Sequence, residues 1–107
     1  MVELIWWLVC AHFLGDFVLQ SRWVAENKGS KWYVLLAHSI TWAAPITVVL
    51  FLFGYFSIPV AVFLVVTHYI IDDWKCMLPM EWKYIYLDQI MHFVSIGLVL
   101  VQSIYLS

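Results

Sequence analysis

Four long apolar segments dominate this chain. They cover roughly residues 4–21, 32–53, 58–74 and 84–106. A helix needs about 20 apolar residues for one bilayer crossing, whereas a barrel strand needs only about 10 alternating ones. Because lipid offers no water to free backbone groups, segments of this length can cross it only as helices. The pattern predicts an all-α polytopic membrane protein, a four-helix transmembrane bundle in a single domain over residues 1–107.

The composition excludes an ordinary soluble domain. Hydrophobic residues make up 65% of the chain and charged residues 11%, whereas a soluble domain carries about 25% charged residues. The net charge of −2 and the absence of a basic stripe exclude a nucleic-acid polymer as partner. The first residues lack a basic region and a small-residue cleavage motif, so we expect the first segment to be retained.

The basic residues are confined to two connections between the apolar segments. These residues are Arg22, Lys28, Lys31, Lys75 and Lys83. Because cytoplasmic loops are enriched in lysine and arginine, loops 22–31 and 75–83 are predicted to be cytoplasmic and both termini to lie outside. The lipid bilayer is then the first expected partner, and a homo-oligomer remains an open alternative.

Ionisable residues interrupt every one of these apolar segments. Each segment contains one histidine, and three of the histidines have an aspartate four residues away, on the same helical face. The full set is His12, Asp16, His38, His68, Asp72, Asp88 and His92. At about 1.5 Å per residue, all of them lie in one layer about 5–15 Å from the basic connections. Such residues mark a functional site within a membrane, so the layer predicts one shared site.

The chain also resembles two similar helical hairpins. The arrangement of His12, Asp16 and His38 is repeated by His68, Asp72 and His92. A parallel repeat of this kind predicts a pseudo-twofold axis along the membrane normal. Asp88 has no counterpart in the first hairpin, where Val34 takes the equivalent position. We therefore interpret Asp88 as a catalytic candidate, either a bridging carboxylate or the group that positions the attacking water.

Burial of these carboxylates requires neutralisation. An aspartate at the centre of a bilayer costs about 2.5–3.5 kcal/mol. Bound cations meet this need, and carboxylates and imidazoles are their usual ligands. We expect two divalent metal ions, zinc first, with iron and manganese as alternatives. A single His/Asp pair is more often a packing pair or a proton relay, but three pairs at one depth favour a metal site.

Several polar residues beside this layer are weaker candidates. Glu26 is a candidate general base, and Lys28 a candidate anion contact, in the loop over the site. Gln20, Asp73 and Gln89 are candidates for orienting the ligands or contacting substrate. The simpler interpretation of each is a solvated loop charge or an interfacial polar residue.

The motifs resemble those of a family of small bacterial and phage membrane proteins, the domain of unknown function numbered 3307. The matching stretches are His12-Phe-Leu-Gly-Asp16-Phe-Val-Leu-Gln20, Trp23-Val-Ala-Glu-Asn-Lys-Gly29, His38, His68-Tyr-Ile-Ile-Asp72 and Asp88-Gln-Ile-Met-His92. The resemblance implies a bacterial inner membrane but no activity. More remotely, the repeated His-xxx-Asp spacing is similar to that of inner-membrane proteins regarded as metal-dependent hydrolases.

These observations predict a metal-dependent hydrolase embedded in the cytoplasmic leaflet. A metal ion activates water and stabilises charge on a phosphoryl oxygen. A site about one headgroup deep suits a phosphoester such as a lipid-linked phosphate or a nucleotide. Ion or proton transport, or metal binding without hydrolysis, is the main alternative. Haem binding and a non-catalytic role in phage–host interaction also remain open.

Overall fold

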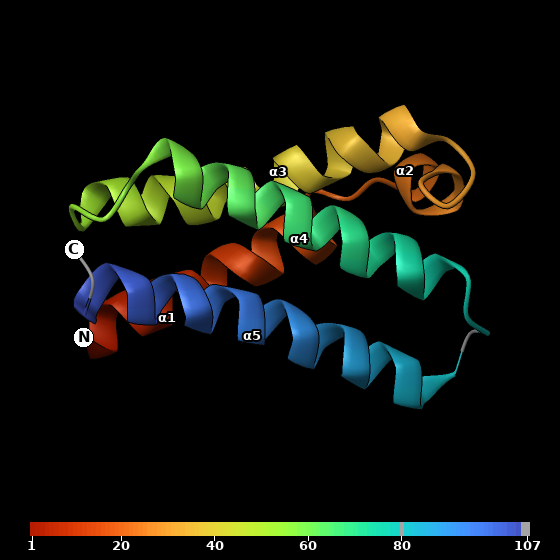
Figure 1. Cartoon of the computed structure of the whole chain (residues 1–107). Coiled ribbons are helices and arrows are strands. Elements are labelled where there is room, and N and C mark those ends of the chain that lie inside the picture. The colour runs from red at the N-terminus through yellow and green to blue at the C-terminus, as the bar shows by residue number, and fades with distance from the viewer. Residues whose placement is uncertain (80, 106–107) are drawn as a thin grey trace.

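The computed structural model describes residues 1–79 and 81–105, and this part of the chain is helical with no strand (Figure 1). The elements are α1 (Val2–Phe13), the π-helical turn η1 (Leu14–Val18), α2 (Arg22–Asn27), α3 (Trp32–Leu52), α4 (Ile58–Cys76) and α5 (Trp82–Tyr105). The all-α prediction is confirmed. The fourth expected segment ends at residue 106, which lies outside the described residues.

Capping residues explain where the helices begin. The Ser21 hydroxyl accepts a hydrogen bond from the Val24 backbone N–H at 3.2 Å and so caps α2. Ser57 caps α4 in the same way, accepting from the Val60 N–H at 3.3 Å. Gly54, just after α3, has a φ of +83°, a conformation that glycine adopts at little cost. The polar and glycine-containing breaks in the sequence therefore act as helix boundaries.

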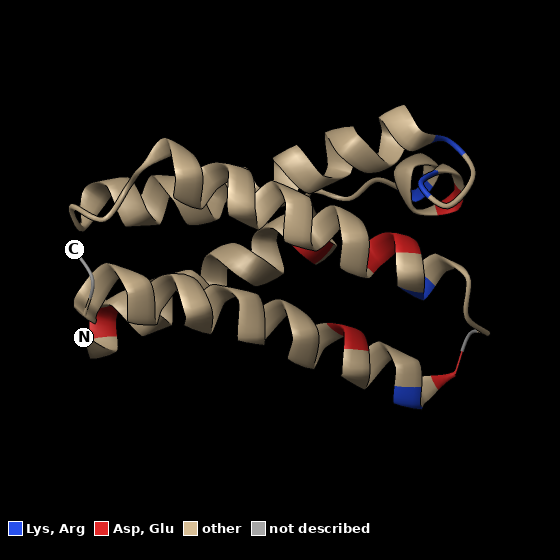
Figure 2. Ribbon diagram, in the orientation of Figure 1, with Lys and Arg blue, Asp and Glu red and all other residues tan. Residues whose placement is uncertain are grey.

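The long helices run up and down side by side. α1 packs against α3, α3 against α4, and α4 against α5. Both termini lie at one end of the bundle, and α2 lies at the opposite end with the α4–α5 connection (Figure 1). The lysine and arginine residues also lie at the α2 end (Figure 2). We call this end the basic end and the other the terminal end.

Two helices, α3 and α5, are long and apolar enough to cross a membrane. The exterior of the bundle is apolar as well, with exposed side chains such as Val48 and Phe51 on α3 and Ile90 and Leu98 on α5. Apolar surface of this extent is typical of contact with lipid or with another protein. These findings support association with a membrane.

The interior is divided into two halves. The terminal half contains a buried apolar cluster drawn from all the long helices: Leu4, Leu8, Ile46, Leu50, Val60, Leu64, Ile96 and Val99. Fully buried Trp42 belongs to this cluster and also contacts the polar residues on its other side. The polar residues thus lie between the apolar cluster and the basic end.

A close backbone contact joins η1 to α3. A Cβ atom built on Gly15 would lie 2.7 Å from Cα and 2.9 Å from the carbonyl oxygen of Trp42. The glycine therefore allows the two backbones to meet, and the wider π-helical turn carries Asp16 at the next position into the interior. π-Helical turns of this kind are frequent at functional sites.

Replacing Gly15 with alanine should destabilise the fold. The new methyl group would press on the Trp42 backbone, and overpacking of this kind costs about 1–3 kcal/mol. Gly97→Ala is the matched control, because a Cβ at Gly97 meets nothing within 4 Å and removing a mid-helix glycine stabilises a helix by about 0.5–1 kcal/mol. Unfolding in detergent, followed by circular dichroism, measures both changes. Equal stability of the two variants would contradict this packing.

Candidate metal centre

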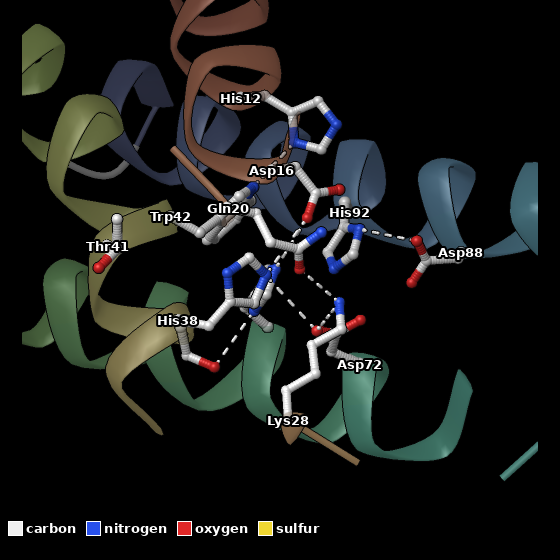
Figure 3. A network of polar contacts seen from close by, with 12 residues as sticks. His12, Asp16, Gln20, Lys28, His38, Thr41, Trp42, Asp72, Asp88 and His92 are labelled. Carbon is white, nitrogen blue, oxygen red and sulfur yellow. Dashed lines mark hydrogen bonds and ion pairs between the residues drawn. The ribbon is translucent and has the colours of Figure 1, made fainter. Parts of the chain in front are cut away.

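The structure brings the His/Asp set of the sequence together inside the bundle. These side chains come from α1, η1, α3, α4 and α5, and all are buried: His12, Asp16, His38, His68, Asp72, Asp88 and His92. Most of them point toward a common centre (Figure 3). Within this set, three-residue groups place a ligand atom from each member within 4.8 Å of the others.

The first group consists of Asp16, His38 and His68. Oδ1 of Asp16 lies 3.5 Å from Nε2 of His38 and 3.6 Å from Nε2 of His68. These distances exceed the 2.7–2.9 Å typical of a charge-assisted N–H···O bond. In contrast, tetrahedral zinc with ligand bonds of about 2.0–2.2 Å holds its ligands about 3.4 Å apart. The spacing therefore fits three ligands around an ion better than direct hydrogen bonds.

The orientation of His68 also suits a ligand. The Ser39 hydroxyl donates to the Leu35 carbonyl oxygen at 2.8 Å, so its oxygen accepts the Nδ1–H of His68 at 3.2 Å. This leaves the lone pair on Nε2, which is buried without a hydrogen-bond partner among the described residues. The Trp42 ring stacks on the imidazole with a centroid distance of 4.5 Å. Metal-binding histidines are typically held by such a bond at the other nitrogen.

The second group consists of Asp16, Asp88 and His92. Nδ1 of His92 lies 3.7 Å from Oδ2 of Asp88, and neither ring nitrogen has a hydrogen-bond partner among the described residues. The His92 ring stacks on His68 at 4.6 Å, so the two groups are adjacent. Asp16 belongs to both groups and is the carboxylate that they share, whereas Asp88, the carboxylate expected to bridge, belongs to the second group alone.

His12 belongs to neither group, although the sequence predicted it to be a metal ligand. Its Nδ1 accepts the indole N–H of Trp42 at 3.0 Å, so its Nε2–H donates to Oε1 of Gln89 at 2.8 Å. The Gln89 amide in turn donates to Oδ2 of Asp16 at 2.9 Å and Oδ2 of Asp88 at 3.1 Å. His12 therefore has no lone pair left for an ion. It holds Gln89, which orients the two carboxylates.

Asp72 is also outside the groups, although its Oδ2 lies 3.5 Å from Nε2 of His38. A lysine neutralises this carboxylate. Nζ of Lys28 lies 2.8 Å from Oδ2 of Asp72 and donates to Oε1 of Gln20 at 2.8 Å. The Lys28 side chain is only 9% exposed. Lys28, which the sequence analysis assigned to a loop, thus extends into the interior as the counter-ion of Asp72. The hydrogen bond to Gln20 helps to hold its ammonium there.

A second lysine approaches the centre from α4. Nζ of Lys75 lies 3.7 Å from Oδ2 of Asp88. Lysine side chains therefore neutralise Asp72 and Asp88. The sequence argument, which assigned the neutralisation of the buried carboxylates to bound cations, is corrected for these two residues. Within the described residues, the ion-pair partners of Asp16 are only histidines, His38 and His68.

The remaining sequence candidates are not brought to the centre. Glu26 forms an ion pair with Arg22 at 2.9 Å, and its side chain is 60% exposed. Asp73 is half-buried and belongs to neither group. The structure thus does not bring the expected general base or this neighbour of Asp72 to the ligand atoms.

Sequence reasoning missed three residues that shape the site. Trp42 and Ser39 hold the two histidines, and Lys75 approaches Asp88. The sequence did contain a signal for these residues. Trp42 lies four residues after His38, in the middle of an apolar segment and away from the membrane–water interfaces where tryptophan is enriched. Lys75 lies three residues after Asp72 and so on the same helical face.

Comparison with known proteins yields a family without an assigned activity. No curated protein and no solved structure matches the chain. Residues 4–107, which include both groups, match the family described as protein of unknown function (DUF3307). The chain therefore belongs to this family, as its motifs predicted.

Proposed function

We propose that this protein is a metal-dependent hydrolase, embedded in the membrane, that acts on a phosphoester such as a lipid-linked phosphate or a nucleotide. The observation that carries the proposal is the buried, unbonded Nε2 atoms of His38 and His68, which face Asp16 at 3.5 and 3.6 Å. Two histidines and one carboxylate with an open position form the ligand set of catalytic zinc sites.

The proposed membrane arrangement is a four-helix transmembrane bundle of two hairpins. α1 with η1, α3, α4 and α5 each cross the inner membrane, with both termini outside and loops 22–31 and 75–83 in the cytoplasm. The apolar exterior and the basic residues gathered at one end support this arrangement (Figure 2). The polar half of the interior then lies in the cytoplasmic leaflet, near the headgroups of the lipids.

Charge balance at the centre favours a bound cation. The carboxylates of Asp16, Asp72 and Asp88 carry −3, and Lys28 and Lys75 supply +2, which leaves −1 on the Asp16 side. A divalent ion, zinc in the first instance, reverses this excess and in doing so attracts an anion. Held by Asp16, His38 and His68, such an ion would supply the chemistry of water activation and of charge stabilisation on a phosphoryl oxygen. A second ion at Asp88 requires the Lys75 ammonium to move away.

Transport is the alternative function, since buried histidines and aspartates also form ion and proton paths. The structure favours hydrolysis because the terminal half of the bundle is filled by the buried apolar cluster. A path across the membrane would have to pass Ile46, Leu50 and Leu64, which are fully buried there. The polar groups connect instead to the basic end.

Thiol labelling should place the basic end in the cytoplasm. In a Cys10→Ala background, a membrane-impermeant reagent should label the exposed Cys76 in inside-out vesicles but not in intact cells. Val2→Cys, at an 80% exposed position of the terminal end, should show the reverse pattern once Cys76 is also replaced. Labelling of Cys76 in intact cells would move the centre to the other leaflet.

Metal content should follow the two groups. Gently purified protein should contain about two divalent ions per chain, because two ligand groups share one carboxylate. His38→Ala and His92→Ala should each remove about one ion, and Asp16→Asn should remove nearly all. Glu3→Gln is the control, since this carboxylate lies at the terminal end of the bundle and belongs to neither group. Elemental analysis that finds no transition metal in the wild-type protein would refute the centre.

Turnover should depend on the Asp88 carboxylate. Asp88→Asn keeps the shape of the side chain but removes a ligand of the second group, and groups that act as a unit lose most activity together, on the order of 100-fold or more. Glu3→Gln removes the same charge at the terminal end and should leave turnover unchanged. Zinc- and manganese-loaded protein should be assayed on phosphomonoesters, phosphodiesters and carboxylic esters. Metal or proton flux in proteoliposomes without product release would support transport instead.

A further inference from the structure

A pocket opens at the basic end beside the candidate metal centre. Its volume is about 390 Å³, and residues of α2, α4, α5 and the segments that flank α2 line it, among them Gln20, Lys28, Lys75, Cys76, Tyr84 and Ile85. Sites for small molecules typically measure about 300–1,000 Å³. The pocket is therefore large enough for a headgroup-sized ligand.

The two lysines of the pocket differ in what they are free to do. Lys28 is 9% exposed and has two partners at 2.8 Å, Asp72 and Gln20. Lys75 is 29% exposed, and the 3.7 Å between its Nζ and Oδ2 of Asp88 exceeds the 2.7–2.9 Å of a charge-assisted hydrogen bond. Lys28 is thus committed to Asp72, whereas the Lys75 ammonium remains available for a stronger partner.

The position of Lys75 connects the pocket to the centre. Its ammonium lines the pocket and also lies beside Asp88, a member of the second ligand group. An anion bound to Lys75 therefore lies next to the groups proposed to act on it. A cation bound by Asp88 would remove the only carboxylate paired with Lys75 among the described residues, and so would free the ammonium for that anion.

The surroundings of the pocket suit a ligand with both polar and apolar parts. Ile85 and Leu78 form part of its wall. Trp82 and Met77, large apolar side chains at the adjoining ends of α5 and α4, are exposed. Such side chains are typical of the membrane interface, where a headgroup meets its acyl chains.

We propose that this pocket is a phosphate-binding site and that Lys75, rather than Lys28, is the cation that recognises the phosphate group. The inference rests on the proposed function for the cleavage that follows binding. The shared chemistry is a phosphate ester, which either a lipid headgroup or a soluble ester supplies. Glu26 and Glu81 also line the pocket, but each pairs with a basic residue, Arg22 and Lys83 respectively, and takes no part in holding the anion.

Binding by purified protein in detergent tests this assignment. Calorimetric titration with inorganic phosphate and with dihexanoyl phosphatidate should give a Kd for wild type that Lys75→Gln raises about tenfold or more, the scale of one charge-assisted bond. Lys75→Arg should retain most of the affinity. Lys31→Gln is the matched control: Lys31 lies at the same end, donates to Oδ1 of Asn27 at 2.8 Å and does not line the pocket.

The outcomes separate the pocket from the metal centre. Tighter binding of phosphatidate than of phosphate, lost in Lys75→Gln, supports the site with a lipid source, and the reverse order supports it with a soluble source. Absence of binding by wild type, or equal affinity of Lys75→Gln and Lys31→Gln, overturns the site. Metal content of the same samples tests the proposed function independently. If the wild-type protein contains no metal but still binds phosphate in a way that depends on Lys75, the metal centre is refuted and the phosphate-binding pocket is supported.

Discussion

The bundle is organised around one buried carboxylate that pairs with no lysine among the described residues. Asp16, on η1, contacts His38 of α3, His68 of α4 and Gln89 of α5, and therefore meets every other long helix. A buried charge without partners is costly, so the helices can pack closely only in an arrangement that surrounds this side chain. The same arrangement directs two imidazole Nε2 atoms and a negative charge at one point, which is also what a metal ion requires.

The four histidines are not equivalent, although the sequence repeats them. His12 and His68 occupy matching positions in the two hairpins, yet Nδ1 of His12 accepts from Trp42 and Nδ1 of His68 donates to Ser39. Ser39 and Trp42 both belong to α3, and their counterparts in the second hairpin are Phe93 and Ile96, respectively. A single helix thus sets the proton positions on both imidazoles, and the repeat that brought the residues together does not preserve their roles.

Much of the architecture could be predicted from the sequence, because long apolar segments and their breaks determine where helices begin and end. The seven buried His/Asp residues could also be found, since residues four apart on a helix share a face. Their individual roles could not. Whether His12 is a ligand depends on Trp42 and Gln89, which lie 30 and 77 residues away in sequence. Likewise, Lys28 is a loop residue by sequence, and only the way that its long side chain folds back makes it the counter-ion of Asp72.

The contacts of Asp16 also bear on how the chain is made. Gln89 follows Asp16 by 73 residues, and synthesis at about 5–20 residues per second delays it by roughly 4–15 s. His38 follows by only 22 residues, on the helix whose backbone meets Gly15. His68 follows Asp16 by 52 residues, so until α4 is made, the partner of Asp16 on another helix is His38 of α3. The contacts of α1 and η1 with α3 can therefore form before the later helices complete the surroundings of Asp16.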